Sequence, residues 1–322
     1  MTVLQPLNAA SGALLALLIA ALPATAATWV VTPGQSLGEA LHRAADGDVI
    51  ELAAGEHRGQ VGVIEHKRLT LRGVGGRPVL HAAGRHAEGK ATLVVRNGEV
   101  QIENIEFRGS RVPDGNGAGI RFERGRLTVL KCAFFDNQNG ILTANAADAE
   151  LVVRDSEFGQ APQGMQLPHL LYVGRIARFT LSGSRFSGGA QGHLVKSRAR
   201  TSDVRNNQLV DSPDGQAAYE LEFPNGGEVT VVGNVIGQSA GTRNPAIVSY
   251  GAEGYGAGPH SLVMSDNTLI NGASRGGVFV RVFVGVHDAA PPPSLRVFDN
   301  RLYGPGDPGA AWPAQGNLQQ PL

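Results

Sequence analysis

The sequence predicts an all-β fold: a single-stranded right-handed parallel β-helix of about nine stacked coils, closed at its N-terminal end by a short α-helical cap. Three observations lead to this prediction. One apolar pattern recurs along the chain, its copies lie 23 to 33 residues apart, and glycine is abundant at 44 of 322 residues. Coils of that length hold two or three short strands, and glycine supplies the turns between them.

The repeated block is an eight-residue pattern: apolar, any, apolar, any two, a hub residue, any, apolar. We call its sixth residue the hub. The copies are Val100–Phe107, Leu127–Phe134, Leu151–Phe158, Phe179–Phe186, Ser202–Leu209, Val229–Ile236, Leu262–Leu269 and Leu295–Leu302. Equivalent residues of stacked coils lie over one another, so the four asparagine hubs (Asn207, Asn234, Asn267, Asn300) are expected to hydrogen-bond along the stack and to tolerate left-handed turn geometry. We assign them a structural role.

The N-terminal residues 1–26 are typical of a secretory signal peptide. The apolar segment Ala13–Leu22 is short for a membrane span, and Ala24 and Ala26 supply a small-x-small cleavage pattern. The segment before it carries no Lys or Arg, so a retained anchor is the alternative. We expect a secreted or periplasmic protein without a membrane span after cleavage.

The β-helix domain is predicted over residues 27–303, with a cap over 27–48 and a tail rich in proline and glycine over 304–322. In the cap, Ser36 and Glu39 have the spacing of a capping box, and apolar residues follow at helical spacing. A helix there would hide the apolar side chains and strand edges at the open end of the coil stack.

Composition limits the partners and covalent cross-links that the chain can have. The formal net charge is zero and no run of Lys or Arg occurs, which argues against a nucleic-acid partner because phosphate binding needs a basic surface. The single Cys132 cannot form an intramolecular disulfide. Capped coils leave no obligatory partner, so a monomer is expected.

Candidate chemistry lies on the strand about ten to fifteen residues before each hub. Alternation within this strand points Lys196, Glu222 and Arg281 outward, because their neighbours Val195, Leu221 and Val280 point inward. Arg121, Tyr172 and Ser249 belong to the same strand of other coils. The long outer strand face of a β-helix is a groove for an extended polymer, and an anionic polysaccharide is the expected partner.

Two reactions fit these residues. For β-elimination on a uronate, Lys196 is the candidate base, and Arg198 is a nearby cation that would lower its pKa. Glu220 and Glu222 lie two residues apart on one strand face, and with Asn225 they offer the oxygen ligands that Ca²⁺ prefers. The two glutamates would alternatively form the acid/base pair of a glycoside hydrolase. No other cofactor is expected.

Further substrate-binding residues are expected around this strand. His193 precedes Lys196 by three residues. The insertion between Gln238 and His260 supplies Arg243 and Tyr250, whose ring would stack on a sugar. Arg243 or Arg281 would hold a carboxylate, and Arg198 is a further substrate-binding candidate.

The segment "TPGQSLGEALHRAADGDVIELAAGEHRG" resembles the start of pectate-lyase-like β-helix proteins, which share the pectin lyase fold and its repeats. Residues 193–215, "HLVKSRARTSDVRNNQLVDSPDG", followed by "VTVVGNVI", are similar to two coils of the alginate and chondroitin B lyases of polysaccharide lyase family six. The resemblance implies that Lys196, followed by Ser197, is a catalytic base. The family's next coil carries an arginine, and the corresponding stretch here, Glu220–Glu228, has none.

Three functions stay open on the sequence alone. The first is a lyase that cleaves a uronate polysaccharide, the second a non-catalytic carbohydrate-binding or scaffold protein, and the third a glycoside hydrolase.

Overall fold

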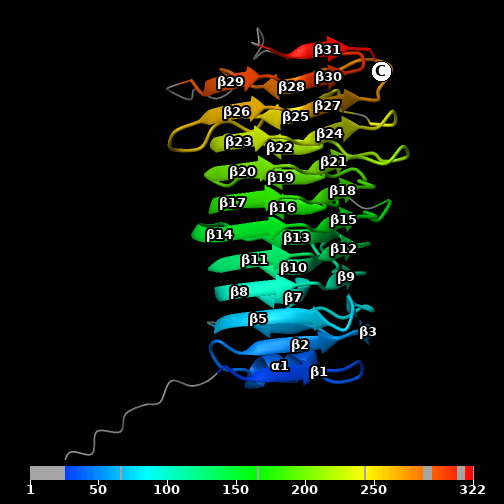
Figure 1. Ribbon diagram of the computed structural model, residues 1–322, viewed down its shortest axis with the longest axis vertical. Helices are drawn as coiled ribbons and strands as arrows, with labels where there is room; N and C mark the ends of the chain where they lie inside the picture. The colour runs from blue at the N-terminus through cyan, green and yellow to red at the C-terminus, as the bar shows by residue number, and fades with distance from the viewer. Residues whose placement is uncertain are drawn as a thin grey trace, which may run out of the picture.

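The computed structural model describes residues 26–65, 67–164, 167–242, 244–285, 292–309 and 316–321. The predicted signal peptide, apart from Ala26, and the candidate Arg243 lie outside these ranges. Within them the chain winds into a column of stacked coils with one helix, α1 (Leu37–Arg43) (Figure 1). The predicted parallel β-helix is confirmed. No helix in the described part of the chain is both long and apolar enough to cross a membrane.

Each coil contributes strands to three parallel sheets, which we call A, B and C. Sheet A contains β1 (Thr28–Val31), β2 (Val49–Ala53), β5 (Lys67–Val74), β8 (Gly98–Glu103), β11 (Arg126–Leu130), β14 (Ala146–Arg154), β17 (Ile176–Ser182), β20 (Thr201–Arg205), β23 (Glu228–Val232), β26 (Ser261–Ser265) and β29 (Ser294–Phe298). Sheet B contains β3 (Glu56–Arg58), β6 (Val79–His81), β9 (Glu106–Arg108), β12 (Ala133–Phe135), β15 (Glu157–Gly159), β18 (Arg185–Ser187), β21 (Gln208–Val210), β24 (Val235–Gln238), β27 (Thr268–Asn271), β30 (Arg301–Tyr303) and β31 (Leu318–Gln320). Sheet C contains β4 (Gly62–Ile64), β7 (Ala91–Val95), β10 (Ala118–Phe122), β13 (Asn139–Thr143), β16 (Leu171–Val173), β19 (Val195–Ser197), β22 (Leu221–Phe223), β25 (Ala246–Tyr250) and β28 (Val278–Val282).

The repeated block forms the corner between sheets A and B, and its asparagine hubs make the predicted ladder. The amide of Asn207 donates to Oδ1 of Asn234 at 2.9 Å, Asn234 donates to Asn267 at 3.0 Å, and Asn267 donates to Asn300 at 2.8 Å. Asn300 donates in turn to Asn317 at 2.9 Å. Because each side chain also receives a backbone N–H of the preceding coil, the ladder fixes the register of neighbouring corners.

The left-handed turn does not fall on the hubs, so that part of the prediction is wrong. The residue before each hub adopts it instead: Asn104, Lys131, Asp155, Gly183, Asn206, Gly233, Asp266, Asp299 and Gly316, with φ between 50° and 77°. All but one are Asn, Asp or Gly, the residues for which positive φ costs least. The hub itself is free to point into the stack.

The core contains an aromatic column as well as aliphatic ones. The rings of Phe107, Phe134, Phe158 and Phe186, one from each of four coils, stack with centroids 4.4 to 5.1 Å apart. They are nearly parallel because equivalent residues of successive coils repeat in the same orientation.

A helix covers the N-terminal end of the column, and a further strand extends its C-terminal end. Ser36 accepts from the backbone N–H of Glu39 at 3.1 Å, and α1 buries Leu37 and Leu41 against the first coils at the blue end of Figure 1. At the other end, β31 pairs with β30, so the solenoid continues past the boundary predicted at residue 303.

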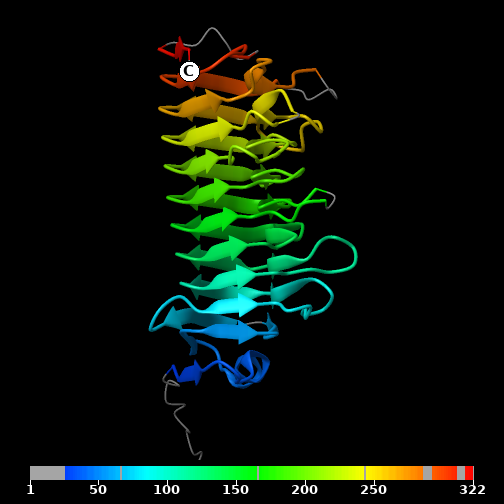
Figure 2. The ribbon, with the colours of Figure 1, turned by 90° about the vertical axis from the view of Figure 1, so that its right-hand side faces the viewer.

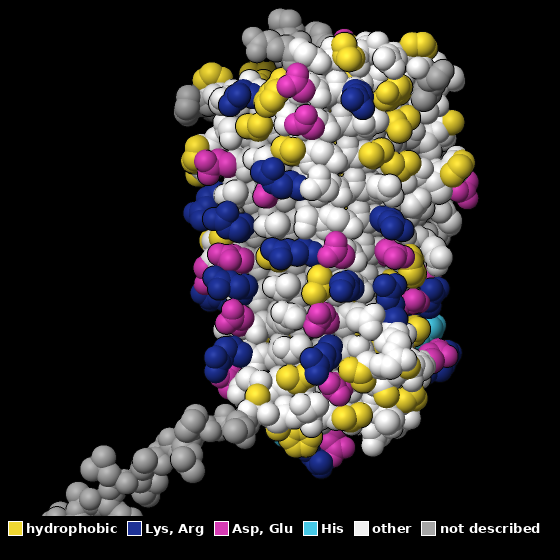
Figure 3. Space-filling view, viewed as in Figure 1, with side chains coloured by type: hydrophobic (Ala, Val, Ile, Leu, Met, Phe, Trp, Pro, Cys, Tyr) yellow, Lys and Arg dark blue, Asp and Glu magenta, His cyan; other side chains and the backbone are white. Residues whose placement is uncertain are grey.

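Charge and loops distinguish the faces of the column. Basic and acidic side chains are interspersed over the face drawn in Figure 3. On sheet A, pairs such as Arg72 and Glu51 link neighbouring coils. Several loops that lead from sheet B to sheet C project from one side of the column in Figure 2. These loops border the outer face of sheet C, on which the candidate residues lie.

Candidate functional site

The register of sheet C aligns the candidate residues in one column on its outer face. The aligned residues are Arg121, Leu142, Tyr172, Lys196, Glu222, Ser249 and Arg281, one from each of seven successive coils from β10 to β28. The alternation of the sequence therefore predicted the face correctly. Neighbouring residues of the column are about 4.8 Å apart along the strand-pairing direction.

At the middle of the column, two cations share a carboxylate from a distant loop. Lys196 Nζ lies 3.0 Å from Glu253 Oε1, and Arg198 Nη2 lies 2.7 Å from Glu253 Oε2. The side chains of Lys196 and Arg198 are only 10% and 13% exposed, whereas that of Glu253 is 44% exposed. Glu253 thus forms the accessible cover of a largely buried pair of cations.

The loop that carries Glu253 is fixed on both sides. The amide of Asn225 donates to the carbonyl of Gly254 at 3.1 Å, and the Tyr255 hydroxyl donates to the carbonyl of Phe283 at 2.8 Å. A Cβ at Gly251 would lie 2.6 Å from the Tyr255 ring, and its φ of 83° also requires glycine. These contacts hold the backbone, while the Glu253 side chain reaches over sheet C.

Arg198 links the cluster to Tyr172. Its Nε donates to the Tyr172 hydroxyl at 2.8 Å, and its Nη1 donates to Asn225 Oδ1 at 2.5 Å. Burial alone would lower the pKa of Arg198, but the bonds to Glu253 and Tyr172 outweigh it and raise the pKa. The guanidinium therefore stays charged. The tyrosine oxygen accepts from it, which leaves the phenolic proton available for donation.

Two histidines lie beside this pair. The rings of His169 and His193 are 4.8 Å apart, and that of His169 is 5.2 Å from Tyr172. Burial, with the positive charges of His193, Lys196 and Arg198, holds the pKa of His169 well below its usual value. Its Nδ1 accepts from the backbone N–H of His193 at 3.1 Å, so the neutral ring carries its proton on Nε2.

Glu222 occupies the centre of the cluster. Its Oε2 lies 2.8 Å from His193 Nε2 and 2.9 Å from Lys196 Nζ. These are electrostatic contacts, since among the described residues neither Glu222 Oε2 nor His193 Nε2 has a well-directed hydrogen-bond partner. Burial alone would raise the pKa of Glu222, but the contacts with His193 and Lys196 together outweigh the effect of burial, so the pKa of Glu222 is lower than usual. Burial lowers the pKa of His193, opposed by Glu222.

The predicted calcium ligands do not form a cation site, and that prediction is corrected. Glu220 is 1% exposed, and its pKa is raised well above the usual value by burial and then by the nearby Asp211. Glu222 Oε2 already contacts Lys196 and Asn225 Oδ1 accepts from Arg198, so each of these two residues already has a cationic partner. The described residues contain no group of three acidic, histidine or cysteine side chains fit for a metal ion.

The same burial removes the catalytic role predicted for Glu220. A carboxyl that is covered and separate from the Lys196 cluster does not face a polymer, so Glu220 and Glu222 do not form the acid/base pair of a hydrolase.

Two other predicted residues lie outside the cluster. Tyr250 is wrong as a sugar-stacking residue: it belongs to β25, is 0% exposed, and its hydroxyl donates to the carbonyl of Gly227 at 2.7 Å. The predicted insertion is therefore two loops separated by a strand of sheet C. Arg281 lies on the column two coils beyond Glu222, and its guanidinium is over the Phe283 ring at 6.0 Å.

The sequence reading missed the roles of His169, Tyr172 and Glu253. Tyr172 was placed on the correct strand but was given no function. Glu253 lies in the insertion between Gln238 and His260, and its 57-residue separation from Lys196 in the sequence conceals the contact. No local pattern marks such a pair, because it depends on how far a loop folds back over two coils.

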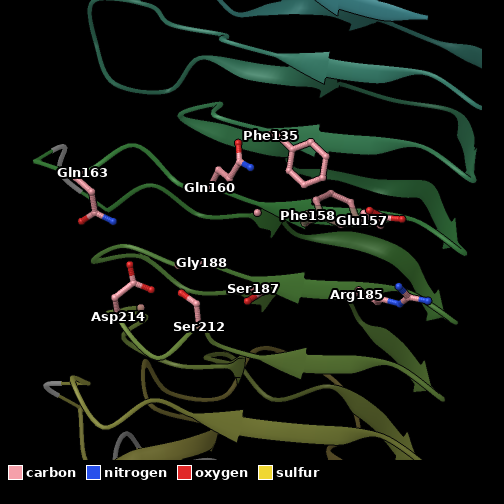
Figure 4. Close-up of a pocket in the computed structure, with 13 residues that line it drawn as sticks. Phe135, Glu157, Phe158, Gln160, Gln163, Arg185, Ser187, Gly188, Ser212 and Asp214 are labelled. Carbon is pink, nitrogen blue, oxygen red and sulfur yellow. The ribbon is translucent and has the colours of Figure 1, made fainter. Parts of the chain in front are cut away.

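A separate hollow of about 460 Å³ lies on sheet B around the Phe135 ring (Figure 4). Gly159 and Ser187 follow Phe135 in register, so small side chains leave the space open. Gln160, Arg185 and Asp214 surround it. It belongs to another face and shares no lining residue with the Lys196 cluster.

Comparison with solved structures places the fold among known β-helices. The PL6 family alginate lyase AlyGC is 17% identical with a TM-score of 0.60, covering 86% of this chain and 40% of that chain. An alginate lyase from Paenibacillus sp. str. FPU-7 is 13% identical with a TM-score of 0.54, covering 91% of this chain and 98% of that one. At these identities the likeness shows the fold alone.

No protein-family model matches the chain, and no curated protein sequence matches it either. The chain spans 40% of the length of AlyGC, so activity is argued from the site.

Proposed function

We propose that this protein binds an acidic polysaccharide along the outer face of sheet C and cleaves it by β-elimination beside Lys196 and Arg198. The observation that carries the proposal is the carboxylate of Glu253, which both cations already bind at 2.7 to 3.0 Å. A uronate carboxylate has the same charge and geometry. The structural likeness to alginate lyases supports a polysaccharide ligand.

In the proposed complex the substrate carboxylate takes the place of the Glu253 carboxylate. Arg198 then neutralises it, which makes the hydrogen on the adjacent sugar carbon more acidic. Nη2 of Arg198, which contacts both oxygens of the Glu253 carboxylate at 2.7 and 2.9 Å, would hold the substrate carboxylate in the same way and orient the sugar. Glu222 and His193 position Lys196 and do not touch the reacting atoms.

The reaction then needs one proton acceptor and one donor. The acceptor removes the hydrogen beside the carboxylate, a carbon–carbon double bond forms, and the bond from the next ring carbon to the glycosidic oxygen breaks. Lys196 in its neutral form is the proposed acceptor. Tyr172, whose oxygen accepts from Arg198 and whose own proton is free, is the proposed donor to the leaving oxygen.

The first experiment is an activity screen of the purified protein. Alginate, pectate, glucuronan and chondroitin are incubated with it, with and without Ca²⁺, and the ultraviolet absorbance of new unsaturated uronates is followed. We expect a rise with at least one polymer. The absence of this signal with every polymer would refute the proposed reaction, and new reducing ends without it would indicate a glycoside hydrolase instead.

The substitution Lys196→Arg tests the base. Arginine keeps the positive charge for the carboxylate but does not lose its proton, so a base role predicts a fall in kcat of about 100- to 10,000-fold. The exposed Lys131→Arg is the matched control and is expected to leave kcat unchanged. Substantial turnover in Lys196→Arg would assign Lys196 to carboxylate binding only.

A non-catalytic carbohydrate-binding protein is the second candidate. The burial of the cluster favours it, because Lys196 and Glu222 are only 8% and 3% exposed. It predicts binding of an acidic oligosaccharide, measured by calorimetry, without any product in the screen.

We also propose that residues 1–26 direct export, so that the protein acts in the periplasm or outside the cell. Mass determination of the N-terminus of the protein recovered from its natural compartment tests whether the segment is removed after Ala26.

A further inference from the structure

A groove on sheet C continues from the Lys196 cluster toward the N-terminal coils. It has a volume of about 650 Å³ and lies over β10, β13 and β16. Tyr172 and His169 line one end and Arg121 lines the other, with Leu142 between them in the register of the sheet. Two coil spacings separate Arg121 from Tyr172, about 10 Å.

Arg121 is the unusual residue of this groove. Its Nε is buried without a hydrogen-bond partner, and the described residues give its guanidinium no ion pair. The nearest acidic groups, Glu123 and Asp114, act on Arg121 through their charge but have other hydrogen-bond partners. Glu123 binds Lys90 at 2.6 Å, and Asp114, which also lines the groove, accepts from the N–H of Asn116 at 3.0 Å. By contrast, Arg124 on the same coil is paired with Asp148 at 2.8 Å.

A partly buried guanidinium with an unsatisfied N–H is costly, because water that it loses on burial is not replaced by a protein acceptor. An anion in the groove would supply that acceptor. Asn116 and Asn145 add exposed amides at the rim, and Leu142 and Tyr172 give an apolar surface. Such a mixture of amides, one aromatic ring and a cation suits a charged sugar.

We propose that Arg121 binds the carboxylate of a second sugar residue, so that the groove is a subsite for a further uronate of the same polymer. This inference rests on the proposed function, since it assumes that another uronate is held at Lys196 and Arg198. It makes two predictions that binding at the cluster alone does not make. Affinity must grow with oligosaccharide length, and that gain must depend on the charge of Arg121.

The test is calorimetric titration of the full-length protein with uronate monosaccharides and tetrasaccharides prepared from alginate and pectate. Arg121→Gln is expected to weaken tetrasaccharide binding by about 10- to 100-fold, the effect of one charge-assisted hydrogen-bonded pair, and to leave monosaccharide binding unchanged. Arg124→Gln removes an exposed, paired arginine of the same coil and serves as the control, with no change expected. Thermal unfolding shows whether each variant is folded, and Arg121→Lys should retain more affinity than Arg121→Gln.

The outcomes separate this inference from the proposed function. Equal tetrasaccharide affinity in the wild type and Arg121→Gln would overturn the Arg121 subsite and leave the cluster intact. Weaker binding of a neutral cello-oligosaccharide by Arg121→Gln, to the same extent, would show a packing effect and also overturn it. No binding of any acidic oligosaccharide by the wild type would refute the proposed function and this subsite together.

Discussion

The clearest test of the candidate site is the substitution Glu253→Gln. In the unliganded protein, Glu253 holds both Lys196 and Arg198, so an acidic ligand must displace it before it can bind. Glutamine has nearly the same size but no charge, and it competes far less for the two cations. Glu253→Gln should therefore bind acidic oligosaccharides more tightly than the wild type.

The magnitude follows from the two ion pairs. Burial raises the pKa of Glu253, but its bonds to Lys196 and Arg198 outweigh this and lower it, so the carboxylate is ionised at neutral pH. Because its side chain is 44% exposed, each pair is worth no more than about 0.5–1 kcal/mol. Removing both ion pairs of Glu253 should then favour ligand binding by about 1–2 kcal/mol, an affinity gain of about 5- to 30-fold.

Isothermal titration with an acidic tetrasaccharide at low and high salt measures this gain. Glu228→Gln, at an exposed position of sheet A, removes the same charge away from the site and should bind as the wild type does. An affinity that is unchanged or lower in Glu253→Gln would refute the reasoning, because Glu253 would then be a ligand-binding residue and not a competitor of the ligand.

Two further predictions concern stability. Asn234→Ala removes the acceptor of two buried donors of Asn207, its backbone N–H and its side-chain amide, so the free energy of unfolding measured in urea titrations should fall by about 2–6 kcal/mol. The exposed control Asn116→Ala should change the free energy of unfolding by less than about 0.5 kcal/mol. Equal effects of the two substitutions would contradict a stabilising role of the asparagine ladder. Burial, followed by Asp211, raises the pKa of Glu220 in the folded state, so its stabilising contribution is present below about pH 4.5 and is lost as pH rises through the folded pKa. Glu220→Gln should therefore raise the melting temperature at about pH 8 more than at about pH 5. An equal change at both pH values would contradict a raised pKa of Glu220. Burial also raises the pKa of Asp211, so part of the pH dependence of stability should remain in the variant.

The fold was predictable because a solenoid repeats the same local problem. Each coil must bury one apolar side, so the pattern of Val229, Val231 and Ile236 recurs in every coil and makes the register visible. The outer face of sheet C was predictable for the same reason, since alternation about Val195 and Leu221 places Lys196 and Glu222 on one side. The left-handed conformation was predicted at the hubs, but the residue before each hub adopts it. Asn, Asp and Gly at most of those positions are the residues that favour this conformation.

What the sequence determined by itself is therefore the periodic part of the molecule: the stacked coils, the asparagine ladder, the helical cap and the column of sheet C. What only the tertiary structure decided is which of the candidate residues are exposed and how the charged ones are paired. Glu220 and Tyr250 are buried, and Glu253 binds Lys196 although the two residues are 57 positions apart in the sequence. The periodicity of the sequence predicts on which face of its strand a side chain lies. Its burial and its charge partners depend instead on the non-repeating loops that fold over that strand.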